Sequence, residues 1–134
     1  MHKSRLAGFI IDCQTENLDA AAHFWGGALG MRVGATSGAN DTYIKLDDGA
    51  RGLIIEVQSV DHASRVHLDI ETDDIEAEVR RLEALGATRV KQVQSWWVMQ
   101  APTGQRFCVV RPQAADFAEH ANVWDEDATR PVAP

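Results

Sequence analysis

A histidine and a carboxylate at alternate positions of one short segment are the residues of this sequence best suited to proton transfer. The segment Arg65–Glu71 alternates between apolar and polar residues, which is typical of a β-strand with one buried face. His67 and Asp69 lie two residues apart, so we expect both side chains on the same face of that strand. An imidazole beside a carboxylate can act as an acid–base pair near neutral pH. The structural alternative is that Asp69 accepts hydrogen bonds from backbone or arginine groups while His67 orders the sheet.

Two more carboxylates, Asp12 and Glu56, lie within apolar strand-like segments. Asp12 has the same strand parity as Gly8, and we expect it to point into a ligand cleft together with His67 and Asp69. Glu56 is a candidate general base on the other side of that cleft. The alternative for Glu56 is an ion pair with Arg106 or Arg111.

Trp96 and Trp97 are adjacent in a predicted strand, so their side chains face opposite sides of the sheet. One of them belongs to the core, and the other is positioned to line the cleft and stack on a flat ligand. The sequence does not distinguish which is which.

The two cysteines, Cys13 and Cys108, each occur in an apolar strand-like run. Two cysteines in a domain of this size do not make a disulfide framework. We therefore interpret both as reduced, buried thiols, which favours a cytoplasmic protein.

A repeated phrase predicts the elements that position these side chains. The sequence "ALGMRV" begins at Ala28, and the similar "ALGATRV" begins at Ala84. In both places a helix is expected to end at a glycine, because the chain leaves a helix with positive φ, and a strand follows. Asn17 is the expected N-cap of the first helix, and Asp73 or Asp74 that of the second. Each helix is preceded by one strand and followed by three, so the sequence predicts two βαβββ modules.

These modules define the predicted fold class and domain organisation. The fold is α+β, with a curved eight-stranded mixed sheet, helices outside and a central cleft in which a ligand would sit. One domain is expected over residues 1–112, with modules at about 8–58 and 65–111. Residues 113–134 form a C-terminal tail whose Phe117, Ala121 and Trp124 indicate a short amphipathic segment, partly docked on its own domain or on a second subunit.

Composition excludes several classes of protein. The 134 residues carry a formal net charge of −7 and are 45% hydrophobic and 25% charged, as in an ordinary globular domain. The acidic balance argues against nonspecific nucleic-acid binding. No apolar run approaches the length that crosses a membrane, and no signal peptide is apparent. No phosphate-binding glycine loop or nucleophile elbow is present.

The duplicated module, with "VHLDIETDDIEAEVRRLEALGA" and "WWVMQAPTGQRFCVVRP", resembles the vicinal oxygen chelate superfamily and, within it, the glyoxalase-like and bleomycin-resistance-like branch. The resemblance covers about residues 8 to 112. It implies the fold and a cleft, but the superfamily contains isomerases, ring-cleaving dioxygenases, epimerases, thiol transferases and metal-free sequestering proteins. The resemblance therefore does not assign a reaction.

The resemblance also implies where a metal would bind. Metal-using members place ligands on the first and last strand of each module. In this sequence the matching residues are Gly8, Glu56, His67 and Cys108, where the family has histidine at the first position and glutamate at the last. Glycine offers no side-chain ligand. A divalent metal held by Glu56, His67 and Cys108 is the remaining option, whereas a small apolar Cys108 packing behind the sheet is the simpler interpretation.

The sequence therefore favours a glyoxalase-like protein that binds a small organic molecule in the cleft between the modules, without metal or other cofactor. His67 and Glu56 are its candidate proton-transfer residues, and the sequence leaves open whether it is an enzyme. The alternative is a metal-dependent lyase, isomerase or dioxygenase that uses Glu56, His67 and Cys108. Members of this superfamily commonly pair, and the aromatic tail agrees with a homodimer.

Overall fold

The computed structural model describes residues 1–34, 42–47 and 52–125. The chain forms two compact units. We call residues 8–67 the N-module, and residues 1–7 together with the chain from residue 68 onwards the C-module. Each module is described by itself below.

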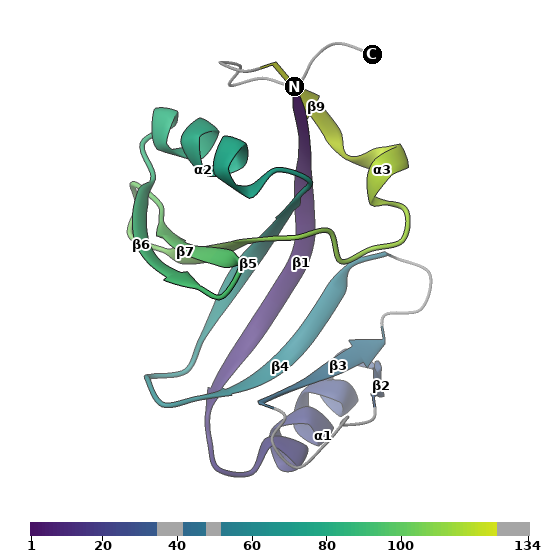
Figure 1. Ribbon diagram of the computed structural model, residues 1–134. Coiled ribbons are helices and arrows are strands. Elements are labelled where there is room, and N and C mark those ends of the chain that lie inside the picture. Colours follow the sequence, from purple (N-terminus) through teal and green to yellow (C-terminus); the bar gives the residue numbers. More distant parts are fainter. Residues whose placement is uncertain (35–41, 48–51, 126–134) are drawn as a thin grey trace. The chain divides into compact units, whose positions relative to one another are not determined.

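The N-module consists of one helix and a set of paired strands, one face of which the helix covers. The helix α1 (Leu18–Leu29) packs on the strands β2, β3 and β4 (Figure 1). The strand order is β2–β3–β4–β1, in which β1 and β4 are parallel and the other pairs are antiparallel. The strands are β1 (His2–Gln14), which belongs to this module from Gly8 onwards, β2 (Arg32–Val33), β3 (Tyr43–Asp47) and β4 (Ile54–Val60).

The core of the N-module lies between α1 and one face of these strands. Leu46, Ile55 and Val57 are buried there, with Phe9 and Trp25 packed against them. Phe9 is in register with Ile55, so the odd-numbered residues of β1 and β4 face the helix. The even-numbered residues therefore lie on the face opposite α1.

The ends of α1 are those predicted from the sequence. The Asn17 side chain accepts a hydrogen bond from Ala20 N at 3.0 Å, and Gly30 ends the helix with a left-handed φ of 69°. The helix is only partly buried: Ala22 is fully buried, whereas Leu29 is 40% exposed. Phe24 is also exposed, so Trp25 is the aromatic anchor of this helix.

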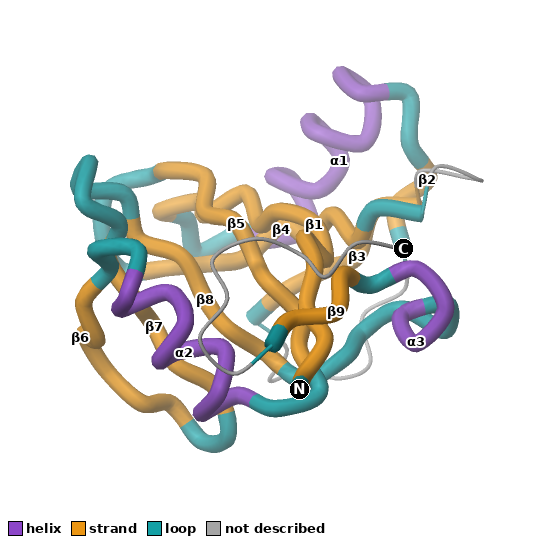
Figure 2. Tube along the Cα trace, turned by 90° about the horizontal axis from the view of Figure 1, so that it is seen from above, coloured by secondary structure: helices purple, strands orange, loops and turns teal. Residues whose placement is uncertain are grey.

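The C-module repeats the pattern with strand order β5–β8–β7–β6. The pair β5–β8 is parallel, and β8–β7 and β7–β6 are antiparallel. The helix α2 (Ile75–Ala84) lies along β6, β7 and β8 (Figure 2). The strands are β5 (Arg65–Thr72), β6 (Thr88–Val93), β7 (Trp96–Gln100) and β8 (Arg106–Val110).

Strand alternation in the C-module separates the two neighbouring tryptophans. Met99 and Val109 are fully buried beneath α2, and Trp97 packs against this cluster and under the Arg89 guanidinium, 5.1 Å from the ring centre. Trp97 is thus the core tryptophan. Trp96 points to the opposite face of the sheet because it is the next residue along the strand.

The helix α2 begins at Asp74, whose carboxylate accepts a hydrogen bond from Ala77 N at 3.0 Å. The neighbouring Asp73 instead accepts a hydrogen bond from Lys3 N. Gly86 has the expected positive φ, 109°, after the last turn. Leu85 caps the helix and is 49% exposed.

The described part of the tail folds back on the C-module. It forms α3 (Phe117–His120) and the short strand β9 (Asn122–Trp124), which pairs antiparallel with the first residues of β1 (Figure 1). Phe117 and Trp124 are both buried. This pairing explains why β1 begins at His2, whereas the apolar run alone predicts a strand from Gly8.

The predicted fold class is confirmed: each half of the described chain has the order strand, helix, three strands, and the sheet is mixed. No helix among the described residues is long and apolar enough to span a membrane.

Candidate functional site

A close side-chain contact among the predicted site residues joins His67 to Asp12. His67 Nδ1 lies 2.6 Å from Asp12 Oδ2, and the two residues come from β5 and β1 within the N-module. A carboxylate can only accept here, so the imidazole donates its Nδ1 proton. The sequence suggested a pair with Asp69, whereas this hydrogen bond comes from a residue 55 positions earlier in the chain.

Asp12 is the buried anchor of this contact. Its side chain is 2% exposed, and the His67 side chain is 13% exposed. Arg65 approaches the same carboxylate oxygen, with Nε 3.8 Å away. The second oxygen, Oδ1, is buried and has no hydrogen-bond partner among the described residues. A carboxylate is costly to bury without compensation, so the two cationic or proton-donating neighbours are what hold it there.

Glu56 lies on the same face of the N-module as Asp12. The register pairs Ile10 with Glu56 and Asp12 with Gln58, so Glu56 is diagonal to Asp12 on the neighbouring strand. This is the face opposite α1. Glu56 is half-buried, and Lys45 is its register partner on β3.

Gly8 lies at the first position of the ligand set implied by the sequence resemblance, and its surroundings leave no room for a side chain. A Cβ atom built on this glycine would lie 1.8 Å from the Ile54 carbonyl oxygen and 2.6 Å from the carbonyl carbon. Both atoms belong to the backbone of the parallel neighbour β4, which cannot move aside as a flexible side chain could. The glycine is therefore required by strand packing, and position 8 carries no metal ligand.

Three predicted site residues share a face in the C-module. Asp69 is in register with Cys108 on β8, and Cys108 is in register with Val98 on β7. Trp96 lies two residues before Val98, so its side chain is on the same face. This face is opposite α2, because Val109 and Met99 point to the helix. Cys108 is half-buried and does not belong to the core cluster under α2, so the interpretation that it packs between sheet and helix is wrong.

Among the described residues, His67, Asp69 and Cys108 are of types that bind metal ions. The strand β5 carries the first two at alternate positions, and the register of β5 with β8 brings Cys108 beside Asp69. Imidazole, carboxylate and thiolate are all zinc ligands. The donor types therefore fit a metal, although the set differs from the one that the resemblance implies, with Asp69 in place of Glu56.

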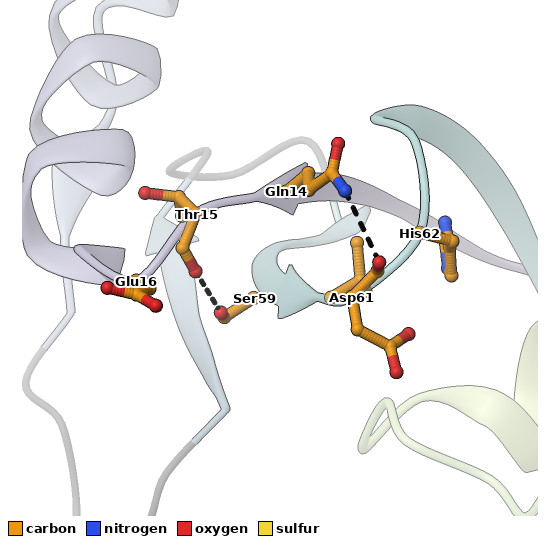
Figure 3. A pocket seen from close by; sticks show the side chains of 7 residues that line it. Gln14, Thr15, Glu16, Ser59, Asp61 and His62 are labelled. Carbon is orange, nitrogen blue, oxygen red and sulfur yellow. Dashed lines mark hydrogen bonds between the residues drawn. The ribbon is translucent and has the colours of Figure 1, made fainter.

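A hollow of about 740 Å³ lies where β1 and β4 end (Figure 3). Its walls are held together by hydrogen bonds from Ser59 Oγ to the Thr15 carbonyl, 2.6 Å, and from Gln14 Nε2 to the Asp61 carbonyl, 3.3 Å. Its lining residues are Gln14, Thr15, Glu16, Ser59, Val60, Asp61 and His62. Sequence reasoning missed this hollow because loop residues after a strand show no periodic pattern.

The hollow connects to the Asp12–His67 pair through one arginine. Arg65 Nη2 lies 3.4 Å from His62 Nε2, and Arg65 Nε approaches Asp12. His62 thus lines the hollow and contacts an arginine of the candidate site. None of Asp12, Glu56 and His67 lines the hollow itself.

Cys13 follows Asp12 but faces α1. Burial raises the pKa of its thiol, a hydrogen bond with Trp25 opposes that effect, and the nearby Asp12 carboxylate adds to it. The thiol is therefore less ionised than an exposed cysteine at neutral pH. Cys13 contributes packing and not nucleophilic chemistry.

Comparison with known proteins identifies similar families and folds. A family model described as "Glyoxalase-like domain" matches residues 8–110. The chain is similar in structure to methylmalonyl-CoA epimerase from Mycobacterium tuberculosis, with 17% identity, a TM-score of 0.55, and coverage of 81% of this chain and 87% of that one. It is also similar to a Legionella pneumophila protein described as NAD-dependent benzaldehyde dehydrogenase, with 10% identity, a TM-score of 0.56, and coverage of 78% and 99%.

A third similar structure is a Streptomyces coelicolor methylmalonyl-CoA epimerase variant in complex with 2-nitronate-propionyl-CoA. It has 14% identity and a TM-score of 0.52, with coverage of 81% of this chain and 98% of that one. At these identities the likeness concerns the fold alone. Comparison with curated protein sequences gave no match.

Proposed function

Because this chain belongs to the glyoxalase-like domain family of the vicinal oxygen chelate superfamily, we propose that it binds a small organic molecule without using a metal ion. The proposed binding surface includes the face of the N-module opposite α1, around Asp12, Glu56 and His67. Asp69, Cys108 and Trp96 are the C-module residues that we assign to the same function.

The observation that carries this proposal is the close packing at Gly8. A side chain at this position would clash with the Ile54 carbonyl oxygen, so the first ligand of the metal-using pattern is absent. The last position of that pattern holds Cys108 where the family has glutamate. A catalytic metal site normally requires three protein ligands, and the family pattern retains only two of its residue types here, Glu56 and His67.

Without a metal, His67 is the residue best placed for chemistry. Asp12 holds its Nδ1 and so fixes the plane of the ring. The imidazole would bind a polar group of the ligand or move a proton, and Glu56 on the neighbouring strand would act as a second base. Trp96 would supply a flat apolar surface for stacking.

The experiment that tests this function starts with elemental analysis of full-length protein purified without chelator, alongside the His67→Ala variant. We expect no stoichiometric zinc, iron, nickel or manganese in either protein. A small-molecule library is then screened by tryptophan fluorescence, and any ligand should bind at least about tenfold more weakly to His67→Ala. Near-stoichiometric metal that disappears in the variant would contradict the metal-free proposal.

A second candidate function is that of a metal-dependent lyase, isomerase or dioxygenase. Two observations favour it: His67, Asp69 and Cys108 offer suitable ligand atoms, and a carboxylate on the Nδ1 of a histidine is the usual support of a metal-binding imidazole. A bound metal would act there as a Lewis acid. Metal content of Cys108→Ser, Asp69→Asn and Glu56→Gln would then identify the ligands, because only loss of a true ligand removes the ion.

We also propose that the protein forms a homodimer and acts in the cytoplasm. The family resemblance supports the first proposal, and the free thiols of Cys13 and Cys108 support the second. Light scattering on the full chain tests the dimer directly, since a monomer mass near the 14.7 kDa of one chain would contradict it.

A further inference from the structure

A buried ionic cluster in the C-module joins both ends of the described chain to α2. At its centre Glu78 is fully buried, and its carboxylate accepts from Arg81 Nε and Nη2 at 2.7 and 2.8 Å. His2 Nε2 lies 2.8 Å from the same carboxylate. Three elements therefore meet here, because Glu78 and Arg81 belong to α2, His2 belongs to β1, and Trp124 of β9 lies over Arg81.

Trp124 is attached to this cluster in two ways. The Arg81 guanidinium carbon lies 3.7 Å from the centre of its ring, which is a cation–π contact. Its indole Nε1 donates to Ser4 Oγ at 2.8 Å. Only three register pairs hold β9 on β1, from His2–Trp124 to Ser4–Asn122. A strand this short depends on side-chain anchors more than on its ladder.

The preceding part of the tail is held by a different set of contacts. Glu71, also fully buried, accepts from the backbone N–H groups of Gln113 and Ala114 at 2.8 and 3.1 Å. Arg5 bonds to Asp116 at 2.6 Å, and Lys3 Nζ donates to the Ala118 carbonyl at 2.8 Å. The tail thus has two separate attachments, and only the later one passes through Glu78.

The later attachment, that of β9 through Trp124 and Arg81, depends on the negative charge of Glu78. Its immediate neighbours are the Arg81 guanidinium, the His2 imidazole and the Ser4 hydroxyl. Burial alone would raise the pKa of this carboxyl, but hydrogen bonds from Arg81, His2 and Ser4 outweigh burial and lower it. When the carboxyl is neutral, the largely buried guanidinium of Arg81 loses its counter-ion.

We propose that residues 113–125 form a releasable strap, and that ionised Glu78 is the latch that keeps its last strand, β9, on the edge of β1. Protonation of Glu78 withdraws the anion that positions Arg81 beneath Trp124, and β9 leaves while the earlier attachment at Glu71 persists. Release uncovers the backbone edge of residues 2–4, which can then pair with another strand. This inference does not depend on the proposed ligand-binding function.

The test measures exchange of the Trp124 indole Nε1 proton with solvent by NMR in the full chain at neutral pH. Glu78→Gln, which mimics the protonated carboxyl, should speed this exchange roughly tenfold or more, because a charged hydrogen-bond acceptor is lost. Glu76→Gln is the matched control. Glu76 lies on the same helix and has an arginine partner, Arg89, but it has no contact with β1 or β9 among the described residues.

The Trp97 indole and the backbone amides of β7 serve as internal references. An unchanged Trp124 rate in Glu78→Gln would overturn the latch. Equal acceleration of Trp124 and the references would also overturn it, because Glu78 would then support the whole module.

The unmodified chain provides a second measurement that does not rely on a variant. On acidification, the Trp124 resonances should change at a pH above that of global unfolding measured by circular dichroism. A single coincident transition would contradict a separate strap.

Discussion

At the scale of single residues, one missing Cβ determines what chemistry the first strand can support. Gly8 lies against the Ile54 carbonyl in a parallel strand pair, and even a methyl group there overlaps the backbone. The side chain that remains for chemistry, His67, is oriented by Asp12 from the same strand as Gly8. The strand β1 therefore shapes the site in two ways: it excludes a side chain at Gly8, and it supplies the Asp12 carboxylate that orients His67.

Gly8→Ala should lower the free energy of unfolding by about 3 kcal/mol, because the backbone of β1 or β4 must shift to accommodate the methyl group. Gly27→Ala is the matched control: no atom lies within 4 Å of a Cβ at this helical position, so we expect a gain of about 0.5–1 kcal/mol. Chemical denaturation measures both changes. Equal stability of Gly8→Ala and the unmodified chain would contradict the close approach of Gly8 to the Ile54 carbonyl.

Cys13 provides a pH-dependent prediction at the same scale. Burial raises the pKa of this thiol, so its alkylation rate should reach half its maximum at a pH above the ordinary thiol value of about 8.5. The measurement uses Cys108→Ser, which leaves Cys13 as the sole cysteine, with a cysteine peptide as reference. A half-maximum below that of the peptide would mean that the thiol is activated and would contradict a packing role.

At the scale of elements, helix caps fix where each repeated module turns from strand to helix. Asn17 and Asp74 occupy equivalent positions, and each side chain accepts one backbone N–H of the first turn at 3.0 Å. The glycine within each repeated phrase, Gly30 in the first and Gly86 in the second, has positive φ. Local chemistry of this kind is readable from sequence because the partners lie within three residues of each other.

Asn17→Ala and Asp74→Ala should each lower the free energy of unfolding by about 1 kcal/mol, since each removes one capping hydrogen bond. Thermal and urea unfolding followed by far-ultraviolet circular dichroism provide the measurement. Glu16→Ala, next to the first cap but exposed, should change stability by less than about 0.5 kcal/mol. If the three variants behave alike, the caps do not stabilise these helices.

At the scale of the whole molecule, buried carboxylates connect segments that are distant in the chain. Glu71 on β5 and Glu78 on α2 are both fully buried. Glu71 accepts hydrogen bonds from Arg5 and from the backbone of the tail at Gln113, whereas Glu78 contacts His2 directly and reaches the tail only through Arg81, which lies against Trp124. Such groups stabilise the fold only in the protonation state that their partners require. The stability of the C-module is therefore linked to pH.

The free energy of unfolding should decrease as the pH falls, and Glu78 should account for most of that decrease. Its folded pKa is below the ordinary value of 4.5, so its stabilising contribution is complete above that pH and is lost as the pH falls through the lowered value. Glu78→Gln should cost about 2 kcal/mol at pH 7 and make stability less dependent on pH below 4.5. Urea unfolding between pH 7 and pH 3 measures both effects.

Glu76→Gln is the comparison for this titration. The pKa of Glu76 is also lowered, mainly by its hydrogen bond with Arg89, but its side chain is half-exposed and solvent screens the pair. Its removal should leave the acid slope almost unchanged. If the dependence of unfolding free energy on pH changes in Glu76→Gln but not in Glu78→Gln, the surface pair controls stability in acid.

The sequence by itself determined the two βαβββ modules, the helix caps and the set of residues from which a site could be built. These follow from hydrophobic periodicity and from turn chemistry, which act over a few neighbouring residues. It also predicted the opposite orientations of Trp96 and Trp97, because strand alternation is local.

Only the tertiary structure decided which of those residues meet. His67 contacts Asp12, Trp97 and not Trp96 belongs to the core, and the tail is anchored by Arg81 and Ser4. Each of these choices depends on strand register or on contacts between segments more than forty residues apart. No pattern within one segment encodes such a contact, because its energy exists only when both segments are in place.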